Sequence, residues 1–139
     1  EPHPIIMKVS ISSKPFKNDG TDWSYVPAVA GIVNTTTAVT IKAAGGAGVR
    51  NYITAIQIST SAALATATVL AIRDGAGGTV IWRQSIPTTV NPSGWNFIFP
   101  TPLRSSVNTL LEVVTLTLSA TGAVYFNCQG YTAKDVSDQ

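Results

Sequence analysis

Turn signals rich in glycine and proline divide most of this chain into short segments, and this spacing limits its fold more than any other feature. From Trp23 onward, runs rich in Val, Ile and Thr are separated by turn signals roughly every 8 to 12 residues. Branching at Cβ restricts χ1 and suits a pleated surface. No run shows a convincing helical period. The pattern therefore predicts an all-β protein with an antiparallel β-sandwich.

Seven runs are predicted as strands, and an eighth is possible. The glycine-rich segments 44–48 and 74–78 are predicted as a loop and a hairpin turn, residues 62–65 as a turn of helix, and residues 100–102 as the end of a strand. Eight strands in two facing sheets make a jelly roll, which we expect here. Alternation alone also fits an immunoglobulin-like sandwich, but its Cys-Trp-Cys spacing is missing. The predicted strands span residues 38–43, 50–60, 66–73, 79–85, 94–99, 109–118 and 123–132.

Alternation within these runs also predicts faces. In the strand 94–99, one buried face is predicted to carry Trp95, Phe97 and Phe99, with Asn96 and Ile98 opposite. In the strand 50–60, the same reasoning places Tyr52, Thr54, Ile56 and Ile58 on one face, and Ile53, Ala55, Gln57 and Ser59 on the other. Glu112 stands in an apolar row, so it is expected to pair with one of four arginines: Arg50, Arg73, Arg83 or Arg104.

The N-terminal segment differs from the rest. Residues 1–22 contain Pro2, Pro4 and Pro15, which disfavour a helix and remove ladder donors, so an extended arm is expected before a sandwich domain at 23–139. The apolar side chains of the arm are suited to docking against protein, and its lysines are suited to pairing with carboxylates of a partner. The residues predicted to contact a neighbouring subunit or another partner protein are Ile5, Ile6, Lys8, Val9, Ile11, Lys14 and Lys17.

The composition argues against several classes of function. The chain has one histidine and one cysteine, and the body carries only two carboxylates, Asp74 and Glu112, so acid–base catalysis, nucleophilic catalysis, metal sites and cofactors are not expected. Cys128 is predicted to be a small buried hydrophobe. The basic residues are scattered, which argues against nucleic acid. No apolar run reaches about 18 residues, which argues against a membrane span.

A surface with this composition favours a structural or binding role. Charged residues make up 12% of the chain, about half the usual share, and such a surface is poorly protected against association with other proteins. One alternative is an aromatic platform for sugars. It would be built from Trp23, Tyr25, Trp82 and Trp95, although strand positions such as those of Trp82 and Trp95 are by default core positions.

The region from residue 51 to residue 132 resembles small virion proteins of tailed bacteriophages that decorate or cement capsids. The segments that carry this resemblance are 52–59 (YITAIQIS), 71–75 (AIRDG), 80–83 (VIWR), 97–104 (FIFPTPLR) and 124–131 (VYFNCQGY). The resemblance implies a trimeric, jelly-roll-like protein that binds the exterior of the capsid and reinforces it. The partners it implies are the major capsid protein and the chain itself. The alternative function is a receptor- or carbohydrate-binding module of a phage fibre or another virion component.

Overall fold

The computed structural model describes residues 21–27, 37–117 and 121–135, and all regular structure in these ranges is β-strand. In this part of the chain no helix is long and apolar enough to cross a membrane. The prediction of an all-β fold is confirmed. The strands are β1 (Thr21–Tyr25), β2 (Val39–Lys42), β3 (Val49–Ala62), β4 (Thr68–Asp74), β5 (Thr79–Ile86), β6 (Trp95–Arg104), β7 (Leu111–Thr115) and β8 (Ala123–Lys134).

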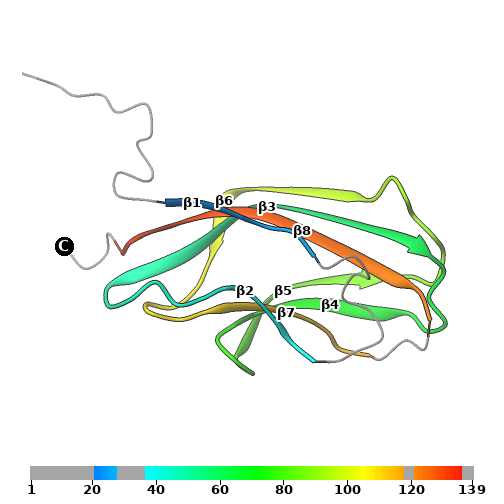
Figure 1. Ribbon diagram of the computed structural model, residues 1–139, viewed down its shortest axis with the longest axis horizontal. Helices are drawn as coiled ribbons and strands as arrows, with labels where there is room; N and C mark the ends of the chain where they lie inside the picture. Colours follow the sequence, from blue (N-terminus) through cyan, green and yellow to red (C-terminus); the bar gives the residue numbers. More distant parts are fainter. Residues whose placement is uncertain (1–20, 28–36, 118–120, 136–139) are drawn as a thin grey trace, which may run out of the picture.

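The strands form two packed antiparallel sheets of four (Figure 1). The first sheet has the order β1-β8-β3-β6 and the second has the order β2-β7-β4-β5. In each sheet the first and last strands in the order are edges, and strands adjacent in sequence often lie in opposite sheets. This is the strand order of a jelly roll, so the predicted β-sandwich and its jelly-roll arrangement are both found.

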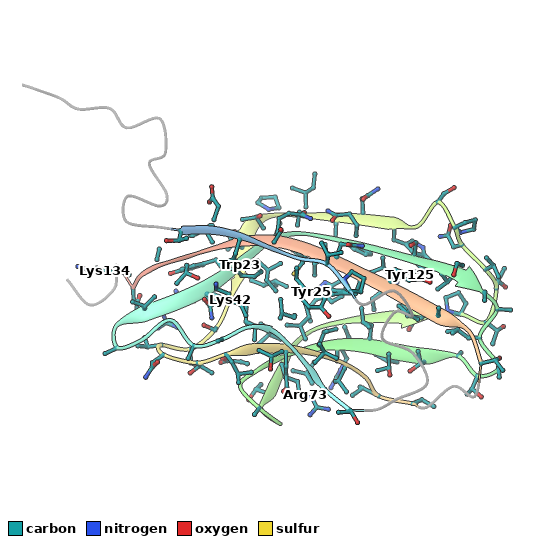
Figure 2. All side chains as sticks on the ribbon, viewed as in Figure 1. Trp23, Tyr25, Lys42, Arg73, Tyr125 and Lys134 are labelled. Atoms are coloured by element: carbon teal, nitrogen blue, oxygen red, sulfur yellow. The ribbon has the colours of Figure 1, made fainter. Side chains whose placement is uncertain are left out.

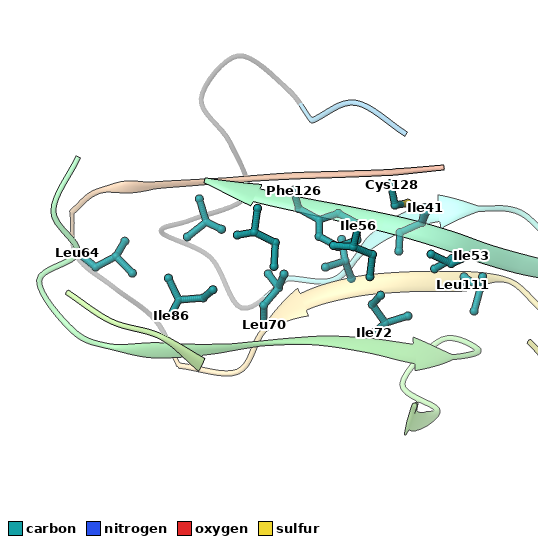
Figure 3. Close-up of a cluster of buried hydrophobic side chains, with 13 residues drawn as sticks. Ile41, Ile53, Ile56, Leu64, Leu70, Ile72, Ile86, Leu111, Phe126 and Cys128 are labelled. Carbon is teal, nitrogen blue, oxygen red and sulfur yellow. The ribbon is translucent and has the colours of Figure 1, made fainter. Parts of the chain in front are cut away.

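The core lies between the sheets and is mainly aliphatic (Figure 3). Ile56 from β3, Leu70 and Ile72 from β4, and Phe126 from β8 are fully buried in it. Cys128 is also fully buried, as predicted. Branched and aromatic side chains fill the space between two pleated surfaces, and their removal from water is the main favourable term in folding.

The strand β1 was not predicted as a strand. It pairs along its whole length with β8, from Thr21 opposite Thr132 to Tyr25 opposite Cys128. Thr21 and Asp22, which the sequence assigns to the arm, therefore belong to the sandwich. Trp23 and Tyr25 point between the sheets (Figure 2), and the indole Nε1 of Trp23 donates a hydrogen bond to Oγ1 of Thr132 at 3.1 Å.

A bulge in β3 overturns the predicted faces of this strand. Between Ile53 and Ala55 the register against β8 shifts, because β3 has one additional residue there. Ile53 therefore faces the core before the bulge, and Ile56 and Ile58 face it afterwards. The prediction that grouped Tyr52 and Thr54 with Ile56 and Ile58 is wrong, because a bulge changes which side of the sheet successive residues occupy.

The strand β6 continues through prolines that were predicted to end it. It pairs only with β3, and an edge strand tolerates proline because its outer N–H groups need no ladder partner. The predicted faces are confirmed: Phe97 and Phe99 pack against the core, while Ile98 is 80% exposed. The aromatic side chains are half-buried, because they close the open side of the sandwich against Trp82, whose ring centroid lies 5.3 Å from that of Phe97.

Two further local predictions concern the turns at residues 74–78 and 62–65. The hairpin at residues 74–78 is confirmed: Gly78 N–H donates to the Gly75 carbonyl at 2.9 Å, and Gly75 and Gly77 adopt positive φ angles of 94° and 64°. The turn of helix at 62–65 is wrong. The strand β3 extends to Ala62, and the chain then bends so that Leu64 enters the core and its N–H donates to the Thr88 carbonyl at 3.2 Å.

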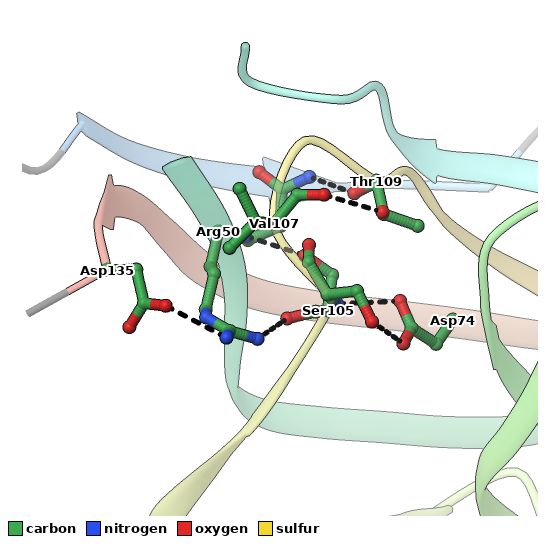
Figure 4. Close-up of polar contacts among 8 residues, drawn as sticks. Arg50, Asp74, Ser105, Val107, Thr109 and Asp135 are labelled. Atoms are coloured by element: carbon green, nitrogen blue, oxygen red, sulfur yellow. Dashed lines mark hydrogen bonds and ion pairs between the residues drawn. The ribbon is translucent and has the colours of Figure 1, made fainter. Parts of the chain in front are cut away.

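Polar contacts hold one end of the sandwich together (Figure 4). Arg50 forms an ion pair with Asp135 at 2.9 Å and donates to the Ser105 carbonyl at 2.9 Å. Asp74 accepts hydrogen bonds from the N–H and the hydroxyl of Ser106 at 2.8 and 2.6 Å. These contacts tie the loop after β6 to β3, to the β4–β5 hairpin and to the end of β8.

Candidate binding face

The arm residues predicted as contacts lie outside the described part of the chain. These are Ile5, Ile6, Lys8, Val9, Ile11, Lys14 and Lys17. Their role stays a prediction. The candidate site below is therefore built from the sandwich itself.

The four aromatic residues of the alternative sugar platform are Trp23, Tyr25, Trp82 and Trp95. All four are partly buried and pack against the hydrophobic core, which is the default position expected for Trp82 and Trp95. Trp82 makes edge-on contacts with the rings of Phe97 and Phe99. Their alternating positions within strands direct these side chains inward, as is typical of a sandwich.

Glu112 has the structural role that was predicted for it. Arg73 is its partner, with 3.4 Å between Nη1 and Oε2, and Gly77 N–H donates to the same oxygen at 3.0 Å. The carboxylate thus fixes the β4–β5 turn against β7. Among the described residues no group of three or more His, Cys, Asp or Glu side chains is arranged to hold a metal ion.

The outer face of the β1-β8-β3-β6 sheet has an unusual composition. In β8, residues alternate with the buried Val124, Phe126 and Cys128, so the residues between them point outward. Neighbouring strands add further amides and hydroxyls, and the charged residues Asp22 and Arg104 lie near the end where β1 begins. We call this surface the amide face; it comprises Ser24, Tyr52, Thr54, Gln57, Ser59, Asn96, Ile98, Tyr125, Asn127, Gln129 and Tyr131.

The amide face is held in place by its own contacts. The side-chain amides of Gln57 and Gln129 form a reciprocal pair, with N–O distances of 3.0 and 2.9 Å. The rings of Tyr52 and Tyr131 stack with centroids 4.7 Å apart and planes 14° apart. Burial raises the pKa of the Tyr131 hydroxyl, and the neighbouring Tyr52 raises it further. The Tyr131 hydroxyl is therefore uncharged at neutral pH, while the paired amides and the stacked rings hold one another in position.

A groove of about 780 Å³ crosses this face at the bulge in β3. Residues 99–102 of β6 stand opposite the single bulged residue Thr54, because Ile53 pairs with Leu103 and Ala55 pairs with Ile98. This mismatch pushes β6 out of the ladder and forms one wall. The lining consists of Asp22, Trp23, Ser24, Thr54, Phe99, Pro100, Pro102, Gln129, Gly130 and Tyr131.

Sequence reasoning did not identify the groove. The alternation of β8 was a usable signal, because it places Tyr125, Asn127, Gln129 and Tyr131 on one face. The groove itself combines β1, β3, β6 and β8, and no local pattern shows that these segments meet.

The large hydrophobic side chains exposed on the described residues come from separate segments. They are Val26, Val90, Ile98 and Leu116, with exposed fractions from 39% to 80%. Scattered exposed hydrophobic side chains are normal on protein surfaces. Of these four, only Ile98 belongs to the amide face.

Cys128 is expected to resist modification until the protein unfolds. Burial raises the pKa of its thiol from 9.0 to about 12. Because the thiolate is the nucleophile, we expect an aromatic disulfide reagent near pH 8 to react at least about 100-fold more slowly with the native protein than with urea-unfolded protein. Fast labelling of the native protein would contradict the buried position.

The same thiol makes stability depend on pH above neutrality. The unfolded thiol ionises near pH 9, whereas the folded thiol stays protonated to about pH 12. The thiol therefore contributes fully to the free energy of unfolding below pH 9. This contribution decreases between pH 9 and 12, by up to about 1.4 kcal/mol per pH unit. Urea unfolding across this range should show a shallower loss of stability in Cys128→Ala than in the natural chain.

A scan against protein-family models and a search of curated proteins find no match for this chain.

Proposed function

We propose that this protein is a non-enzymatic structural protein of a phage virion, which binds the exterior of the capsid as a homotrimer and stabilises the shell. The observation that carries the proposal is that both ends of the described sandwich lie at one pole (Figure 1). Thr21, where β1 begins, pairs with Thr132 near the end of β8, and Asp135 follows directly. Such a body is suited to attachment by its terminal segments at one end.

The N-terminal arm has the length and chemistry for this attachment. Twenty residues precede β1, and a chain of this length spans at most about 70 Å when extended. Its apolar residues suit docking against protein, and Lys8, Lys14 and Lys17 suit carboxylates on a capsid or on a neighbouring copy. Attachment through such exposed pairs is expected to weaken with salt.

The body is suited to repeated display on a shell. Two of its charged pairs, Arg50 with Asp135 and Arg73 with Glu112, are used to fix its own loops and turns. When three attachments are linked in one trimer, each raises the effective concentration of the others, so weak contacts give a high overall affinity. A protein that binds only the assembled shell stabilises that shell by mass action.

The first test measures attachment. Purified heads of the phage that encodes the protein, stripped of accessory proteins, are mixed with the natural chain and with a variant in which Lys8, Lys14 and Lys17 are changed to Gln. We expect the natural chain to co-sediment and to raise the temperature at which heads rupture. We expect the variant to bind about tenfold more weakly, with a smaller salt dependence.

A matched control carries the same change in charge on the body. It replaces Lys42, Arg83 and Arg104 with Gln, and its co-sedimentation should stay close to that of the natural chain. Equal losses in both variants would show a general charge effect and would contradict attachment by the arm. Failure of the natural chain to bind heads would contradict the capsid role itself.

The trimer is tested separately. Light scattering coupled to size exclusion should give three times the chain mass of 14.5 kDa. A stable monomer at tens of micromolar would contradict it.

A further inference from the structure

We propose that the groove on the amide face is a binding site for a neutral oligosaccharide. This inference rests on the geometry of the groove and does not depend on the capsid role. It shares only Trp23 with the aromatic platform considered from the sequence, because Tyr25, Trp82 and Trp95 are not among the residues that line the groove.

The groove has the size and the mixed chemistry that a sugar chain requires. Its volume of about 780 Å³ falls within the range of ligand sites, which is roughly 300–1,000 Å³. Phe99, Pro100 and Pro102 form an apolar wall suited to the C–H face of a sugar ring. Across the groove, Ser24 and Gln129 supply hydroxyl and amide groups of the kind that bind sugar hydroxyls. Tyr131 combines both properties, because its ring is apolar and its tip is polar.

The charges around the groove favour a neutral ligand. Among the described residues no lysine or arginine lines it, and the one carboxylate among them is that of Asp22. A phosphate, a sulfated sugar or a nucleic acid would therefore find no cation among these lining residues. A carboxylate does accept hydrogen bonds from sugar hydroxyls, and such charge-assisted bonds are short and strong.

The two central strands beneath the groove offer few free main-chain groups, which disfavours a peptide. Apart from the bulged Thr54, β8 and β3 have a strand on each side, so their N–H and C=O groups are used within the sheet. On β6, Pro100 and Pro102 have no N–H to offer. An extended peptide binds largely through main-chain bonds to a free strand edge, whereas a sugar binds through side-chain hydroxyls and amides.

The site is preorganised. The Thr54 hydroxyl donates to the Gln129 carbonyl at 3.1 Å, and the Gln129 side chain is held by Gln57. Tyr131 is held by its stack on Tyr52. Gly130 has no room for a side chain, because a Cβ would lie 1.9 Å from the Tyr52 carbonyl oxygen and 2.8 Å from the Trp23 ring. Side chains that are fixed in advance lose little entropy on binding.

The test is isothermal titration calorimetry on the full chain. The probes are five neutral hexasaccharides: β-1,4-glucose, β-1,3-glucose, α-1,4-glucose, α-1,6-mannose and β-1,4-N-acetylglucosamine. Sulfated heparin hexasaccharide and a peptide of residues 1–20 serve as competing ligand classes. We expect at least one neutral probe to bind with a Kd of about 1 mM or tighter.

Two groove variants and one matched control assign the binding to this site. Tyr131→Ala removes the stacked ring, and Ser24→Arg fills the groove from an exposed position on an edge strand, where no core contact is lost. Both should weaken binding at least tenfold. The control is Tyr125→Ala, on the same face of β8 but outside the groove, which should leave the Kd within twofold.

Several outcomes would overturn the proposal. The first is that none of the five neutral probes binds at concentrations up to about 5 mM. The second is that a sugar binds equally well to both groove variants, or that Tyr125→Ala loses as much affinity as they do. The third is that heparin or the peptide binds more tightly than any neutral sugar. Near-ultraviolet circular dichroism verifies that each variant is folded. If Tyr131→Ala does not fold, Ser24→Arg still tests the groove.

Discussion

Replacing Asn51 with leucine should lower the free energy of unfolding by about 3–5 kcal/mol, because several buried groups lose their partners at once. Asn51 is fully buried, and its amide donates to the carbonyls of Ala43 at 2.9 Å and Thr109 at 3.3 Å. Its side-chain oxygen accepts a hydrogen bond of 2.6 Å from the Thr132 hydroxyl, which in turn accepts from Trp23. One side chain thus links β1, β3 and β8 to two loops.

Urea unfolding at a fixed protein concentration measures this effect as a lower midpoint with an unchanged slope. The matched control is Asn96→Leu, at an exposed position on β6 of the same sheet, which should change stability by less than about 0.5 kcal/mol. Similar small losses in both variants would show that the hydrogen bonds of Asn51 are not needed for stability.

Replacing Ile56 with alanine should cost about 2–5 kcal/mol, from lost burial and from the cavity that remains. Ile56 is fully buried in the core, whereas Ile98 in the neighbouring strand is 80% exposed. The two lie close together in the ladder, since Ile98 pairs with Ala55, the residue before Ile56.

Ile98→Ala is therefore the control, with the same chemical change on the opposite face of the sheet. It should change stability by less than about 0.5 kcal/mol. The difference between the two variants tests the placement of the β3 bulge directly. If the register were shifted by one residue, Ile56 would face solvent and its replacement would cost little.

Much of the local structure was predictable from the sequence. The stretch Asp74-Gly75-Ala76-Gly77-Gly78 predicts a hairpin turn because glycine adopts positive φ at little cost, and the structure has that turn. In β6 the alternation of Trp95, Phe97 and Phe99 with Asn96 and Ile98 predicts the inner and outer faces correctly. Glu112 in an apolar row predicts a cationic partner, although the choice of Arg73 over three other arginines required the fold.

Other features depend on pairing between distant strands. Thr54 bulges because β3 has to match β8 on one side and β6 on the other, and neither register is visible in the sequence of β3. Pro100 and Pro102 sit within β6 because this strand is an edge, and edge position is a property of the whole sheet. The short strand β1 exists because β8 offers it a partner along Thr21–Tyr25.

By itself, the sequence determined an all-β chain, the hairpin at residues 74–78 and the inner and outer faces of β6, because steric preference and burial act on each residue locally. The tertiary structure alone decided the order of the strands, the bulge and the groove on the amide face. Tyr131, Ser24, Thr54 and Pro100 lie far apart along the chain, and they line one groove only because β1, β3, β6 and β8 share one sheet. Hydrogen bonding between strands sets their register, and it joins residues that no local pattern connects.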